Sequence, residues 1–230
     1  MTFPAVQSIT STVFSTAATS HLVAMPAVVD TGDLLLCVLN MGFGYTVTTP
    51  GGWSAIENSN TRLAVYAKDA AGTEDGTTVD FVSATAAEAV AQVYRITGWN
   101  GTVPTDIATA TLATGTSVNP NPGSVTPSWG ALDTLWIAAE RSVAGETVSS
   151  YPANYTNGTY DFVASNIALA TSRREINAAT ENPGTYTISA SGTWYAVTIA
   201  VRPAAVAPVP THIGAAFSDP ELPEALMLPY

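Results

Sequence analysis

Cysteine and histidine are scarce in this 230-residue chain, which limits the chemistry it can support. Cys37 is the only cysteine, so no internal disulfide can form, and its apolar neighbours predict a buried thiol that packs as a small apolar group. His21 and His212 are the only histidines and lie far apart, so neither a zinc site nor a Ser-His-Asp triad is indicated. Residues 30–33 contain carboxylates suited to calcium, but no dense acidic loop is present. We expect no metal and no cofactor.

Positive charge is also scarce. Lys and Arg total seven and do not cluster, against 18 Asp and Glu, for a net charge of −11. This balance argues against a nucleic-acid backbone or an anionic membrane surface as partner. No run approaches the 18 consecutive apolar residues of a membrane helix. Residues 1–13 lack a basic segment and a long apolar core, so we expect no signal peptide. We expect the protein to be made and folded in the reducing cytoplasm of a host cell.

Catalytic motifs are missing as well. The chain has no G-x-S-x-G, no P-loop and no H-E-x-x-H. A glycosidase would need two carboxylates facing each other across a cleft. Four acids are candidates by residue type alone: Glu57, Glu74, Asp80 and Glu88. No pair of acids repeats along one strand face. We therefore expect a protein that is not an enzyme.

What the chain does contain is the pattern of an all-β protein. Hydrophobic residues make up 47% of it, enough for a sizeable core at this length. Residues 62–68 alternate in the manner of a half-buried strand, and residues 34–40 are apolar on both sides, which predicts a central strand. Residues 72–76 resemble a hairpin turn leading into residues 77–82. Strands are expected at 3–14 (an edge strand), 21–25, 34–40, 45–48, 62–68, 77–82, from about 89 to 96, 135–140, 154–162, 167–173, 185–190 and 193–202.

The strand pattern is repeated in the second half of the sequence. The segment that begins at Asp33 resembles the one that begins at Asp133, which pairs Leu35 with Leu135. Pro50 and Trp53 recur as Pro152 and Tyr155, and Arg95 recurs as Arg202. A period of about 100 residues is too long for a solenoid or a propeller blade. It predicts an antiparallel β-sandwich over residues 1–203 with half-repeats at about 20–98 and 115–203, or else two small β-domains.

Aromatic residues suggest both core and ligand contacts. Trp136 and Trp194 fall within expected strands and are assigned to the core, and Trp53 is expected to close one end of it. Trp99 and Trp129 fall in loop-like segments, where they are candidates for stacking on sugar rings. If Trp99 is exposed, its replacement by Ala should change stability little.

Composition changes after Pro203. Residues 204–230 are predicted to form a semi-rigid, Pro-rich linker followed by an extended docking arm. Such an arm cannot order itself in isolation, because fixing its backbone offsets the gain from burial. The candidate partner-docking residues are its apolar side chains: Phe217, Leu222, Leu226, Met227, Leu228 and Tyr230.

The motif at Pro50 and Trp53, the segment 62–68, the stretch 74–79 and the ending at Arg95 and Gly98 resemble a group of tailed-bacteriophage virion proteins. These are jelly-roll-like β-sandwiches that occur as head decoration proteins and as minor tail or fibre components. The likeness covers about residues 20–203, and the second half matches more loosely. The group carries no catalytic residues, so the resemblance transfers none.

The function expected from this resemblance is structural: a capsid decoration or cement protein on the head of the virion. Its partner would be the major capsid protein or another virion protein. We prefer the head because the chain forms one compact unit with an apolar arm and has no coiled coil or fibre repeat. The alternatives are a tail or fibre component and a glycan-binding host adhesin module. Whether the protein is a homo-oligomer stays open.

Overall fold

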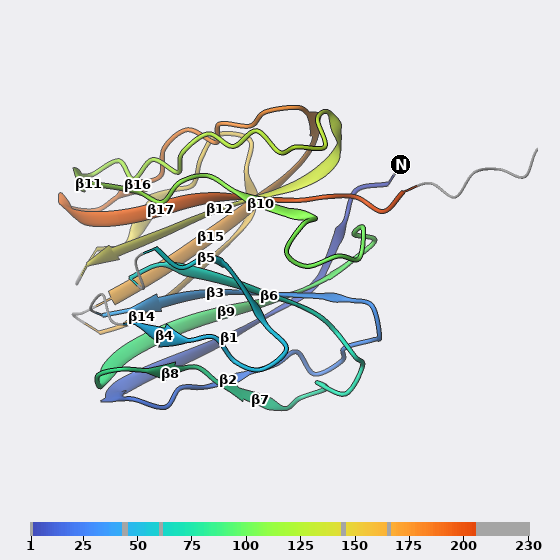
Figure 1. Cartoon of the computed structure of the whole chain (residues 1–230). Coiled ribbons are helices and arrows are strands. Elements are labelled where there is room, and N and C mark those ends of the chain that lie inside the picture. The colour runs from blue at the N-terminus through green and yellow to red at the C-terminus, as the bar shows by residue number, and fades with distance from the viewer. Residues whose placement is uncertain (1, 43–45, 60–61, 144–145, 165–166, 206–230) are drawn as a thin grey trace, which may run out of the picture.

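The computed structural model describes residues 2–42, 46–59, 62–143, 146–164 and 167–205, and every regular element in them is a β-strand (Figure 1). The first sheet has the order β1 (Ala5–Ala18), β9 (Ala87–Thr97), β3 (Leu34–Met41), β6 (Ala64–Asp69) and β5 (Ser54–Glu57). The second has the order β10 (Ile107–Thr109), β17 (Gly192–Val201), β12 (Leu132–Val143), β15 (Ile167–Ala178) and β14 (Thr156–Val163), with β11 (Ala113–Ser117) also on β17. All pairings are antiparallel, which confirms the sandwich.

Each sheet comes from one half of the chain, and the two sheets have equivalent topologies. β3 lies between β9 and β6, and β12 lies in the same way between β17 and β15. The edge strand β1, 14 residues long, corresponds to β10 and β11, which both pair with β17. The prediction of two similar halves is therefore confirmed, as is the central position of residues 34–40 and the edge position of β1.

The residue-by-residue match between the halves was wrong by one position. Leu35 points into a cluster on the outer face of the first sheet, whereas Leu135 points into the core between the sheets. Because side chains in a strand alternate between faces, a shift of one residue exchanges the two faces. Leu34, Leu36 and Val38 are the residues of β3 that share the inter-sheet core with Leu135.

The inner strands are buried on both faces because small sheets cover the outside of each large one. β2 (Leu22–Ala24) pairs with β7 (Thr78–Asp80), and β4 (Val47–Thr48) pairs with β8 (Val82–Ser83). β13 (Val148–Ser150) pairs with β16 (Thr187–Ile188). The prediction of a half-buried strand at 62–68 was therefore wrong: Ala64 and Tyr66 on its outer side are as fully buried as Val65 on its inner side.

The predicted hairpin at residues 72–76 was also wrong. The turn is present, with the N–H of Thr77 donating to the C=O of Glu74 at 3.1 Å. It leads, however, into β7, which pairs with β2. β6 cannot accept β7 as a neighbour because β3 and β5 already occupy its two edges.

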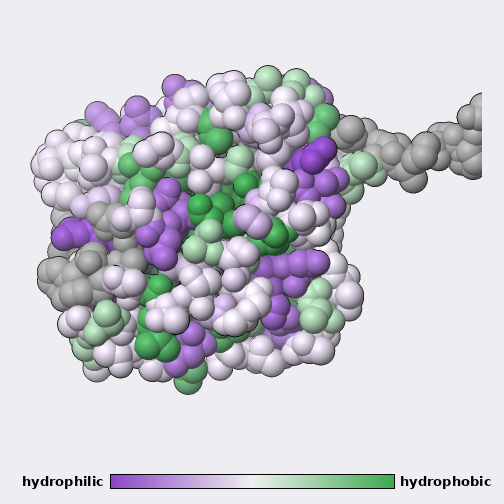
Figure 2. Space-filling view, in the orientation of Figure 1, coloured by the Kyte–Doolittle hydropathy of each residue, from purple (hydrophilic) through white to green (hydrophobic). Residues whose placement is uncertain are grey.

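The expected core residues are buried. Trp136 and Trp194 are 0% and 8% exposed, and Trp53 is 7% exposed against Phe81. Cys37 is buried, and burial raises the pKa of its thiol above the ordinary value. Figure 2 shows apolar residues in small groups separated by polar ones over the face in view. Among the residues that the structure describes, no helix is long and apolar enough to cross a membrane.

Candidate functional site

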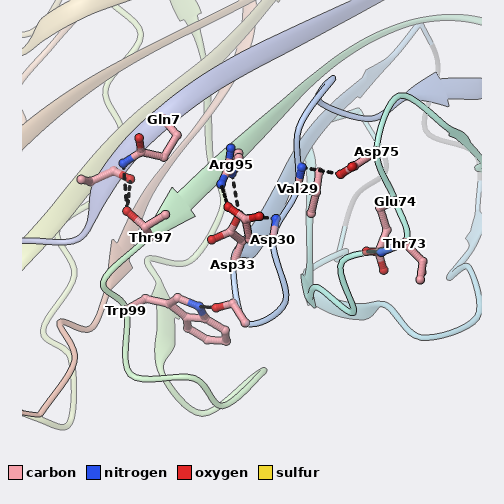
Figure 3. A network of polar contacts seen from close by, with 12 residues as sticks. Gln7, Val29, Asp30, Asp33, Thr73, Glu74, Asp75, Arg95, Thr97 and Trp99 are labelled. Carbon is pink, nitrogen blue, oxygen red and sulfur yellow. Dashed lines mark hydrogen bonds and ion pairs between the residues drawn. The ribbon is translucent and has the colours of Figure 1, made fainter.

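A polar cluster at one end of the first sheet is centred on Arg95 of β9 (Figure 3). Its Nε donates to Asp33 at 2.5 Å and its Nη2 donates to Asp30 at the same distance. Asp33 also accepts the N–H of Asp30 at 2.9 Å, which closes the turn before β3. The hydrogen bond that Arg95 donates to Asp33 is the main cause that raises the pKa of Arg95. The carboxylates of residues 30–33 thus face a guanidinium, so this loop is a brace and not a calcium site.

Trp99 belongs to the same cluster, and its expected exposure was wrong. The indole is 5% exposed, packs in the inter-sheet core and donates its Nε1–H to the C=O of Gly32 at 2.8 Å. A buried ring cannot stack on a sugar. Trp129 is half-buried and donates to the hydroxyl of Thr134 at 3.2 Å.

The acids considered for catalysis are held by local partners. Glu57 accepts the N–H of Ser59 at 2.8 Å. Asp80 accepts the N–H of His21 at the same distance, and the His21 ring is buried within 3.0 Å of the C=O of Phe81. Glu88 lies half-buried on β9. These positions lie on separate strands and turns, and no catalytic pair follows from their contacts.

Glu74 pairs with Lys68 at 2.8 Å and accepts the N–H groups of Ala71 and Thr73. Desolvation would raise the pKa of this carboxyl, but the ion pair and the backbone donors outweigh it and lower the pKa to about 2. Glu74 is therefore charged at neutral pH, and its contacts hold the turn in place. Among the described residues, no group of three or more His, Cys, Asp or Glu could hold a metal ion.

A second group of polar side chains joins the two sheets through hydrogen bonds. Asp161 of β14 accepts hydrogen bonds from Ser11 of β1 at 2.6 Å and from Gln92 of β9 at 2.7 Å. The hydroxyl of Thr171 on β15 donates to Gln92 at 2.6 Å and accepts from Tyr94 at 2.5 Å. These bonds run from one sheet to the other, so they fix the relative position of the two layers.

Glu140 and Arg141 are neighbouring buried ionisable residues of β12, and they lie on opposite faces of the second sheet because side chains alternate along a strand. Arg141 donates to the side chain of Asn40 and to the C=O of Gly42, both at 3.2 Å. Neither carboxylate oxygen of Glu140 has a hydrogen-bond partner among the residues that the structure describes, and its exposure is 0%. Desolvation, with a smaller contribution from Glu146, raises the pKa of Glu140 to about 8 against the opposing effect of Arg141.

Hollows in the described surface include three that contain charged or aromatic side chains. One of about 350 Å³ lies beside the Arg95 cluster, between Gln7 and Val28. A second, of about 250 Å³, is bordered by Glu146 and by the stacked rings of Tyr160 and Phe162, of which Phe162 is 55% exposed. The third, of about 290 Å³, has an all-polar lining: Asn154, Thr156, Asn157, Arg173, Arg174 and Glu175.

The sequence reasoning did not find the third hollow. Its signal was the adjacent pair Arg173 and Arg174, in a chain with seven basic residues. The docking residues expected in the arm lie outside the described residues: Phe217, Leu222, Leu226, Met227, Leu228 and Tyr230. We found no family model, no curated protein and no solved structure that matches this chain.

Proposed function

We propose that the protein is a non-enzymatic structural component of a tailed-bacteriophage virion, a decoration protein that attaches to the head surface. The observation that carries the proposal is the structural role of the residues on which the resemblance to phage virion proteins rests. Trp53 fills a core, Arg95 is paired with two carboxylates, and Gly98 provides a φ of 69° where the chain turns away from β9. All three positions therefore serve folding and none presents a reactive group, as a structural role requires.

The links between the sheets support the same role. A protein that reinforces a shell must resist shear between its layers. Ser11 and Gln92 in the first sheet both bind Asp161 in the second, and Tyr94 binds Thr171 across the same boundary. Hydrogen bonds to an ionised carboxylate are stronger than those between neutral groups. These bonds tie the two sheets to each other.

Co-sedimentation of the full-length protein with purified empty heads, and separately with purified tails, tests the proposal. We expect retention on heads alone. Retention on tails alone would replace head decoration by the tail or fibre alternative, and retention on neither would refute a virion role. A chain truncated after Pro203 should keep its melting temperature and lose retention, since the arm is proposed to dock. A collapsed melting temperature would place the arm in the core.

The second candidate function, glycan binding, is favoured by one observation. The stacked rings of Tyr160 and Phe162 border a hollow that also contains Glu146, and aromatic faces beside a carboxylate suit a sugar ring. This replaces Trp99 as the stacking site. A glycan array tests it: a signal that disappears in Phe162→Ala would support this function, and a silent array would exclude the glycans displayed.

A further inference from the structure

The all-polar hollow lies where β14 is distorted. The register between β14 and β15 shifts between Thr156 and Thr159, so the intervening residues form a bulge. Asn154 and Asn157 have φ values of 66° and 52°, a conformation that side-chain-bearing residues seldom adopt. Bulges and such backbone outliers occur often beside binding sites, where they redirect side chains. Here they bring two amides to the side of Arg173.

The side chain of Arg173 has no hydrogen-bond or ion-pair partner among the residues that the structure describes, although it is half-buried and its charge lies near Tyr94. Its backbone is paired within the sheet, opposite Ile137 and Thr156. Other basic side chains are bound within the fold, either in ion pairs or to oxygen acceptors: Lys68 to Glu74, Arg95 to Asp30 and Asp33, Arg174 to Glu181, Arg202 to Asp106, and Arg141 to Asn40 and Gly42. In a chain with a net charge of −11, a guanidinium without an acidic partner needs an explanation.

The lining around Arg173 is rich in donors. Asn154 and Asn157 each carry an NH₂ group, Thr156 carries a hydroxyl and Arg173 offers five N–H bonds in a planar fork. Asn157 donates to Thr156 at 3.2 Å, which leaves the Thr156 hydroxyl proton available. A planar guanidinium with neighbouring donors matches the geometry of a carboxylate or phosphate.

We propose that this hollow binds a small oxyanion, a carboxylate or phosphate group, with Arg173 as its principal ligand. Arg174 adds positive charge at the rim, although its ion pair with Glu181 at 3.0 Å offsets part of it. Glu175 also lines the hollow and opposes an anion. Its carboxylate forms no ion pair with Arg173 in the described structure. Removing that negative charge should therefore strengthen binding.

Isothermal titration of the full-length protein with sodium phosphate and, separately, with sodium acetate tests the proposal at constant ionic strength. We expect saturable binding of at least one anion. The titration that shows binding, with phosphate or with acetate, identifies the group that the hollow recognises. Arg173→Gln should weaken binding about tenfold or more, since a charged hydrogen bond contributes about 1.5–3 kcal/mol. Glu175→Gln should tighten it.

Arg62→Gln is the matched control, because it removes the same charge from the turn before β6, outside the hollow, and should leave both affinities unchanged. Binding that survives Arg173→Gln, or that is insensitive to Glu175→Gln, would overturn the assignment of the site. The absence of saturable binding in both titrations would overturn it as well. Melting curves of each variant confirm that it is folded. None of these readouts depends on attachment to heads.

Discussion

Trp53 and Tyr155 close equivalent turns in the two halves of the molecule. The backbone N–H of each donates to the C=O of the proline three residues earlier, Pro50 or Pro152, and both bonds measure 3.1 Å. The residue before each aromatic has a positive φ, 79° at Gly52 and 66° at Asn154. Each ring is 7% exposed and packs on the outer face of its own sheet. The repeat therefore extends to the geometry of single turns.

The turn geometry predicts different tolerances at two adjacent glycines. Gly52→Ala should destabilise the protein by about 1–2 kcal/mol, because a Cβ at positive φ approaches the following carbonyl. Gly51→Ala should have little effect, since its φ lies outside the left-handed region and no atom lies within 4 Å of an added Cβ. Urea midpoints of the two variants check this, and equal losses would contradict it.

Trp99 is expected to matter for stability as much as Trp53. Both rings are buried, and truncation of a buried Trp typically costs about 3–5 kcal/mol. Trp99→Ala also leaves the C=O of Gly32 without its donor. The control is Phe162→Ala, which removes an aromatic ring that is 55% exposed and should change stability by about 0.5 kcal/mol or less. A near-neutral Trp99→Ala in chemical denaturation would refute the burial.

Arg95 pairs with two aspartates, Asp30 and Asp33, that look alike in the sequence but differ in exposure. The Asp33 side chain is 7% exposed and that of Asp30 is 75% exposed. We expect Asp33→Asn to cost about 2–3 kcal/mol, since it removes a charged hydrogen bond in a buried setting. Asp30→Asn should cost about 0.5 kcal/mol or less, because solvent screens an exposed pair. Thermal melts at two salt concentrations test the ranking, and the reverse order would contradict it.

Alternation and apolar runs predicted the long inner strands, because they report local geometry and burial. They missed four short strands that carry no such pattern: β5, β10, β11 and β13. β3 was recognised as central from its two apolar faces, and the doubled pattern predicted two similar sheets. Pairing was harder to predict: nothing within residues 62–82 shows that β5 occupies the edge of β6. Trp99 was assigned to a loop, which was correct locally. Its burial depends on Gly32, which is distant in the sequence and brought near only by the fold. The Arg173 hollow likewise depends on a bulge that composition does not reveal.

Glu140 predicts how stability depends on pH. Its pKa is about 8 in the folded protein, above the ordinary value of 4.5, because burial disfavours the charged form. Between these two values the folded state keeps a proton that the unfolded state has lost. The stability contribution is therefore fully present below pH 4.5 and is lost as the pH rises toward 8, by about 1.4 kcal/mol per pH unit.

Glu140→Gln removes the ionisation while keeping the shape of the side chain, so it isolates this effect. We expect the variant to match the wild type near pH 5 and to become progressively more stable than it up to about pH 8, since only the wild type must keep a buried acid protonated. The control is Glu57→Gln, which replaces a half-buried carboxylate that accepts the N–H of Ser59. Urea denaturation at several pH values measures the difference of each variant from the wild type. A constant difference between Glu140→Gln and the wild type would show that Glu140 has an ordinary pKa and is reached by solvent.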